Sequence, residues 1–93
     1  MVETVTVTIE ADGDEDAITV PAGLIERLSE PEDTTAEVVA DLALLSFAGR
    51  AHALLHHGHG EADGELEAIE ADVMDRFEAR FGVSYAEATG HSH

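Results

Sequence analysis

The stretch TVTVTIEADGDEDAITV (residues 4–20) predicts two β-strands joined by a tight turn. Apolar residues alternate with threonine or acidic residues on both sides of Asp12-Gly13, which is the period of a half-buried strand. The Asp-Gly dipeptide accepts positive φ at both positions of a type I′ turn. A two-residue loop there pairs Val7 with Ile18, so the apolar side chains of both strands share one face. The predicted strands are residues 4–11 and 14–20.

A long helix is predicted for residues 35–57. Thr34 and Glu37 have the spacing of a capping box, and Gly58 ends the apolar run that follows. Apolar side chains lie nearly all round this helix, a pattern typical of a buried helix. One hairpin and one other long helix are too little to cover it. We therefore expect self-association, with a homodimer as its simplest form.

A second main helix is predicted for residues 64–81, and shorter helices after Pro21 and over residues 84–89. The apolar stripe of the second main helix ends before Gly82, a residue suited to the position after a helix. We expect an α+β fold in which an N-terminal β-hairpin packs on two main α-helices plus short flanking helices (ββααα-like). Residues 1–93 form a single domain in this prediction, with residues 90–93 as a flexible tail.

The charge of the chain is strongly negative. Twenty-one acidic residues stand against four arginines, lysine is absent, and the formal net charge is −17. Such a charge destabilises a compact state at low salt by self-repulsion. At molar salt the Debye length falls to about 3 Å, which screens most of this repulsion. The charge therefore indicates a protein that works at high salt more directly than it indicates a binding partner.

Several classes of protein are disfavoured by the sequence. The absence of cysteine removes disulfides and thiolate chemistry. The amino-terminal MVETVTVTIE has neither a basic nor an apolar signal region. The longest apolar stretch is interrupted by Asp41, Arg50 and His52, which argues against a membrane span. Phosphate-binding, dinucleotide-binding, HExxH and GxSxG motifs are absent, so we expect a cytoplasmic protein that is not an enzyme.

Six histidines are the strongest candidates for chemistry. His52 and His56 stand at i and i+4 on the long predicted helix, where two imidazoles can chelate one divalent ion. We predict a site of His52, His56 and His59, although Glu61, Asp63 or a tail histidine are alternative third ligands. Without thiolates, this nitrogen and oxygen set suits Zn, Ni, Cu or Fe.

Other interpretations of the histidines stay open. Histidine near a helix C-terminus is favoured by the helix dipole, and terminal residues such as His91 and His93 are usually mobile. Histidine also changes charge near neutral pH, which suits proton transfer. The aspartates of the predicted turn begin like a calcium-binding loop, but Ala17 and Gly23 stand where that loop needs Gly and Glu.

Two resemblances add to this interpretation. Residues 18–28 (ITVPAGLIERL) resemble the strand–Pro–helix segment of AbrB/MazE-like swapped-hairpin transcription factors, which implies an interleaved DNA-binding dimer. The turn that faces DNA in that family is here acidic, which argues against nucleic acid as a partner. The whole chain resembles small acidic haloarchaeal proteins of unknown function, and this implies a cytoplasm rich in potassium.

The sequence therefore predicts a non-catalytic binding or assembly module in the cytoplasm of a halophile. The module is expected to be homodimeric and to have a further protein partner of unknown identity. Divalent metal binding by histidine is its most specific predicted activity. A small transcriptional regulator of the swapped-hairpin type is the alternative.

Overall fold

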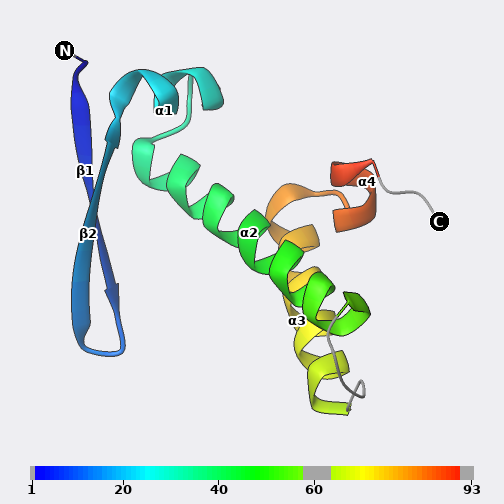
Figure 1. The fold of residues 1–93 in the computed structure, drawn as a ribbon. Coiled ribbons are helices and arrows are strands. Elements are labelled where there is room, and N and C mark those ends of the chain that lie inside the picture. The colour runs from blue at the N-terminus through cyan, green and yellow to red at the C-terminus, as the bar shows by residue number, and fades with distance from the viewer. Residues whose placement is uncertain (1, 58–63, 91–93) are drawn as a thin grey trace. The chain divides into compact units, whose positions relative to one another are not determined.

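The computed structural model describes residues 2–57 and 64–90 (Figure 1). An antiparallel hairpin comes first and helices follow it, which confirms the predicted α+β class. The His59, Glu61, Asp63, His91 and His93 predictions fall outside the described residues. The elements, in chain order, are β1 (Thr4–Ala11), β2 (Asp14–Pro21), α1 (Ala22–Leu28), α2 (Thr35–His57), α3 (Gly64–Phe81) and α4 (Tyr85–Thr89).

The hairpin has the register that its alternation predicts. Val7 lies opposite Ile18, and the turn residues Asp12 and Gly13 have φ of 53° and 84°. These positive values fit a type I′ turn, whose twist matches that of the flanking strands. Pro21 has an extended ψ of 128°, so it ends β2, one residue beyond the predicted strand, and directly precedes α1.

Short-range side-chain caps define the helix ends. The amide of Glu37 donates to Oγ1 of Thr34 at 3.1 Å ahead of α2. The amide of Glu87 donates to Oγ of Ser84 at 3.2 Å ahead of α4. Gly82 follows α3 with a φ of 77°. Because each cap satisfies a backbone group that a helix end leaves unpaired, the sequence sets these boundaries locally.

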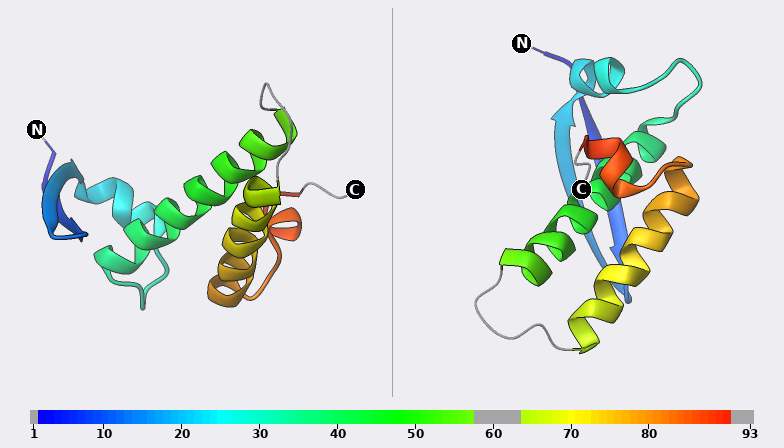
Figure 2. Two further views of the ribbon diagram at one scale, coloured as in Figure 1. Left: turned by 90° about the horizontal axis from the view of Figure 1, so that it is seen from below. Right: turned by 90° about the vertical axis from the view of Figure 1, so that its right-hand side faces the viewer.

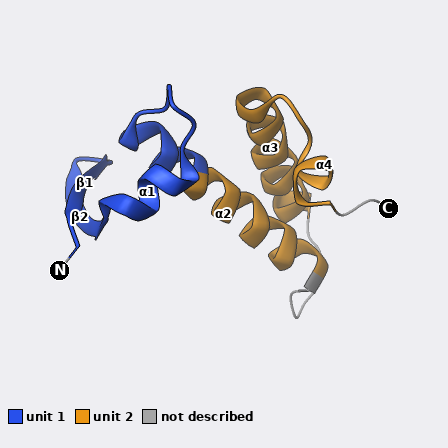
Figure 3. Cartoon of the chain, turned by 90° about the horizontal axis from the view of Figure 1, so that it is seen from above, with its two compact units in different colours: residues 1–41 blue, residues 42–93 orange. Residues whose placement is uncertain are grey.

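The chain divides into two compact units, residues 1–41 and 42–93, with the boundary inside α2 (Figure 3). In the first unit α1 contacts both strands, and Ile25 and Val38 are buried. In the second unit the buried side chains are those of Ala48, Ala51 and Phe77. Phe77 is the one large side chain that is fully buried among the described residues. The prediction that residues 1–93 form one domain, with the hairpin packed on the main helices, stays a prediction.

Helix α2 is less buried than its apolar circumference predicts. Phe47 and Leu54 are 61% and 60% exposed, and Leu42 and Leu45 are 42% and 40% exposed. By length and composition, residues Thr35–His56 satisfy the requirements for a membrane-spanning helix, although the core helix of a soluble protein satisfies them as well. The burial expected for this helix is therefore not reached within one copy of the chain.

An exposed ion pair joins two residues of α3 at i, i+4 spacing. Nε of Arg76 donates to Oδ2 of Asp72 at 2.6 Å. This hydrogen bond, with the attraction of the carboxylate charge, raises the pKa of Arg76. Both side chains are open to water, so screening by salt keeps the contribution of the pair to stability small.

Candidate metal site

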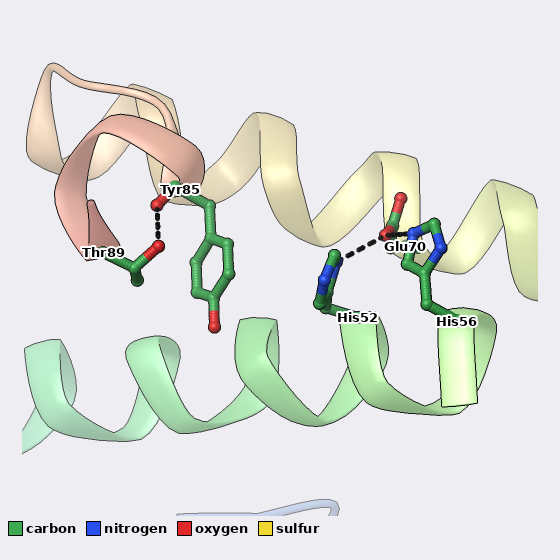
Figure 4. A network of polar contacts seen from close by, with 5 residues as sticks. All are labelled: His52, His56, Glu70, Tyr85 and Thr89. Carbon is green, nitrogen blue, oxygen red and sulfur yellow. Dashed lines mark hydrogen bonds and ion pairs between the residues drawn. The ribbon is translucent and has the colours of Figure 1, made fainter. Parts of the chain in front are cut away.

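Two histidines of α2 and one glutamate of α3 meet within the second unit. Nδ1 of His52 lies 3.4 Å from Oε2 of Glu70, and Nε2 of His56 lies 3.3 Å from the same oxygen. Figure 4 shows both imidazoles projecting from α2 toward this carboxylate. The imidazole rings lie close together, with centroids 4.4 Å apart. The predicted pairing of His52 with His56 on one face of the helix is therefore present.

The spacing of these atoms fits a tetrahedral metal ion. Zinc holds nitrogen and oxygen ligands at about 2.0–2.1 Å, which places neighbouring ligand atoms of a tetrahedron about 3.3–3.4 Å apart. The two nitrogen–oxygen distances in the cluster are 3.4 and 3.3 Å, and the ligand atoms of all three residues lie within 4.8 Å of one another. Both distances exceed those of ordinary N–H···O hydrogen bonds, about 2.7–3.2 Å. The two nitrogen–oxygen spacings are therefore those of a tetrahedral ion, and the spacing between the two nitrogens is at most 4.8 Å.

Glu70 is the candidate ligand that sequence reasoning missed. It stands four residues after Leu66, three before Val73 and seven before Phe77, so it interrupts the apolar face of α3. Its side chain is only 18% exposed, against 38% for His52 and 51% for His56. A partly buried carboxylate is costly unless it is compensated. The signal for Glu70 in the sequence is its position as a charged residue on an otherwise apolar helix face, which indicates a polar partner on a neighbouring element.

Tyr85, at the start of α4, packs beside the cluster. Its ring centroid lies 5.9 Å from that of His52 and 5.5 Å from that of Phe77. Figure 2 shows the chain turning back after α3, which brings α4 into contact with α3. The Tyr85 hydroxyl oxygen lies 3.1 Å from the position that a Cβ on Gly49 would take. The missing side chain of Gly49 therefore admits the Tyr85 ring next to His52.

We expect Gly49→Ala to stabilise the chain more when the Tyr85 hydroxyl is absent than when it is present. Alanine in a helix interior is worth about 0.5–1 kcal/mol over glycine, but here its methyl group presses on that hydroxyl. In a Tyr85→Phe background the full gain is expected, while with Tyr85 present the gain is smaller or reversed. Denaturant unfolding of the two single variants and the double variant measures this difference. An equal effect of Gly49→Ala in both backgrounds would show that the close approach has no energetic consequence.

A pocket of about 260 Å³ opens beside the three candidate ligands. Its remaining lining residues come from α3, the segment after it and α4. They are Met74, Asp75, Glu78, Ser84, Tyr85 and Ala86. An ion held by the cluster would therefore face a small space with carboxylates on its lining.

The structure brings two of the three predicted ligands together, and their binding of a metal stays a prediction. His52 and His56 lie together, whereas His59 is outside the described residues and its role stays a prediction. Among the described residues, one group of three His or acidic side chains has the spacing of metal ligands, and it consists of His52, His56 and Glu70. Two nitrogens and one oxygen remain within the predicted chemistry of borderline transition metals.

The fold and the cluster define a small α+β protein with a candidate two-histidine, one-carboxylate metal site. The chain belongs to a family of unknown function (DUF7545), whose model matches residues 1–93. Comparison with curated proteins and with solved structures found no match.

Proposed function

We propose that this protein is a non-catalytic module that binds a divalent transition metal through His52, His56 and Glu70. The observation that supports it best is the convergence of two imidazole nitrogens on one carboxylate oxygen at 3.4 and 3.3 Å. Because the ligands come from two helices, one ion would tie α2 to α3. The role proposed for the metal is therefore to hold this part of the chain in shape for association.

The donor set favours zinc over hard cations such as Mg²⁺ and Ca²⁺. Those ions prefer cages of oxygen ligands, whereas imidazole suits Zn, Cu, Fe and Ni. The two nitrogen–oxygen spacings near those of a tetrahedron favour zinc within the second group, since zinc sites with such ligands are usually tetrahedral. Neutral imidazoles and one carboxylate leave a divalent ion with a net charge of about +1, which partly offsets the negative charge of the chain.

Zinc titration of the metal-free, untagged protein by calorimetry tests this proposal. We expect one zinc ion per chain for the wild type and the loss of this binding in His52→Ala/His56→Ala. His57→Ala is the matched control, because it removes a histidine next to His56 in the sequence that is not one of the three proposed ligands. Equal zinc binding by the wild type and the double variant would refute the site.

We further propose a homodimer that associates through α2 in the cytoplasm. Only two of the 21 acidic residues, Glu37 and Asp41, lie on this helix. Its exposed apolar residues are therefore where two copies with a charge of −17 can approach with least repulsion. Asp41 and Arg50 would be costly inside a bilayer, which favours a partner chain over a membrane.

Light scattering at molar salt, without detergent, measures this association. A mass near 20 kDa is expected, twice the 9.9 kDa of one chain. Phe47→Gln/Leu54→Gln should reduce the mass to that of a monomer, since these exposed side chains stand two turns apart on one face of α2. Ile69→Gln, a change of an exposed apolar residue on α3, is the control. A wild-type protein with the mass of one chain would contradict the dimer.

The alternative of a swapped-hairpin regulator has less support. The hairpin turn and the strand that follows it carry Asp12, Asp14, Glu15 and Asp16. Affinity for DNA comes largely from Lys and Arg side chains that neutralise phosphates. An acidic hairpin end would instead repel the DNA backbone.

A further inference from the structure

We infer that the metal site keeps one coordination position open, and that this position takes a small, neutral nitrogen heterocycle from the adjoining pocket. The inference rests on the proposed function and specifies the ligand of the same site. Within the described part of the chain the cluster supplies three protein ligands. A tetrahedral ion with three protein ligands leaves its fourth position to water or to an external molecule.

The position of the pocket makes this opening accessible. His52, His56 and Glu70 all line it, and the side chain of His56 is 51% exposed. Drug-sized ligands occupy pockets of roughly 300–1,000 Å³. The volume here is about 260 Å³, just below that range, which suits a small molecule.

The lining chemistry selects the class of ligand. A divalent ion with its three ligands would carry a net charge of about +1. The two carboxylates of Asp75 and Glu78 outweigh this positive charge, so the pocket disfavours anions. Tyr85 and Met74 offer an aromatic ring and a thioether, surfaces against which a flat ring packs well. A neutral azole combines a nitrogen donor for the metal with such a flat ring.

Cobalt(II) in place of zinc gives a direct readout, because its visible absorption changes with its coordination. The experiment uses the untagged protein in sodium sulfate, a salt that screens the chain charge with a weakly coordinating anion. Imidazole and acetate serve as probes of similar size and different charge. We expect a saturable spectral change with imidazole at a concentration at least tenfold lower than with acetate. Metal content after desalting should remain one cobalt per chain.

Asp75→Asn/Glu78→Gln provides the matched variant, since both residues are exposed and neither belongs to the cluster. The preference for imidazole over acetate should fall severalfold in it. Cobalt that binds without any response to imidazole, or that imidazole removes, overturns the open position and leaves the proposed function intact. Equal responses to imidazole and acetate overturn the ligand class. Failure of cobalt and zinc to bind at all overturns the proposed function itself.

Discussion

Zinc is expected to raise the thermal unfolding midpoint of this protein by about 10 °C or more, and Glu70→Gln is expected to remove most of this effect. A ligand that binds only the folded state at 100 times its dissociation constant stabilises that state by about 2.7 kcal/mol. In a domain of 60–100 residues, 1 kcal/mol corresponds to a shift of roughly 4–8 °C. The effect should be large because His52 and His56 belong to α2 while Glu70 belongs to α3.

The control for this prediction is Glu67→Gln. Glu67 is an exposed glutamate one turn before Glu70 on the same helix, and it lies outside the cluster. Its removal changes the chain charge by the same amount, so zinc should stabilise this variant as it does the wild type. Melting curves with zinc and with chelator, recorded for the three proteins, give the comparison. A zinc shift that survives in Glu70→Gln would exclude this carboxylate as a ligand.

Lowering the salt concentration from about 3 M KCl to below about 0.5 M is expected to unfold or expand the chain. The net charge of −17 is then poorly screened, because the Debye length grows as the salt is removed. The proposed adaptation to a halophilic cytoplasm rests on this dependence. Far-ultraviolet circular dichroism across the salt range measures the loss of helix. A spectrum that does not change with salt would refute the prediction.

A charge variant of the hairpin sharpens the salt experiment. Glu10 and Glu15 lie directly opposite each other in the register, and like charges in that position are destabilising. Glu10→Gln/Glu15→Gln should therefore unfold at a lower salt concentration than the wild type. The same midpoint in both proteins would show that this pair carries little of the repulsion.

The parts of the fold that the sequence predicts are those set by neighbouring residues. The Asp12-Gly13 turn fixes the hairpin, because the turn type and the alternation on either side admit one register with all Val and Ile side chains on one face. Thr34 and Ser84 mark helix starts because their hydroxyls bond to backbone amides three residues away. Such features need no knowledge of distant parts of the chain.

Features that depend on how helices face one another were harder to predict. The spacing of His52 and His56 places them on one side of a helix, but it does not say which side chain of α3 stands opposite. Glu70 was therefore missed, although a glutamate on an apolar helix face indicates a partner to be sought. The exposure of α2 agrees with the expectation that one hairpin and one other long helix are too little to cover it, but periodicity shows only which side chains are apolar and not what covers them.

The most direct test of the metal site is elemental analysis of untagged protein purified at high salt without chelator, with His52→Ala/His56→Ala prepared in parallel. The proposed function predicts close to one transition-metal ion per wild-type chain, most of it zinc, and almost none in the double variant. No metal in the wild type, even after incubation with zinc and nickel, would contradict it. The cluster of His52, His56 and Glu70 would then be a set of polar contacts between α2 and α3.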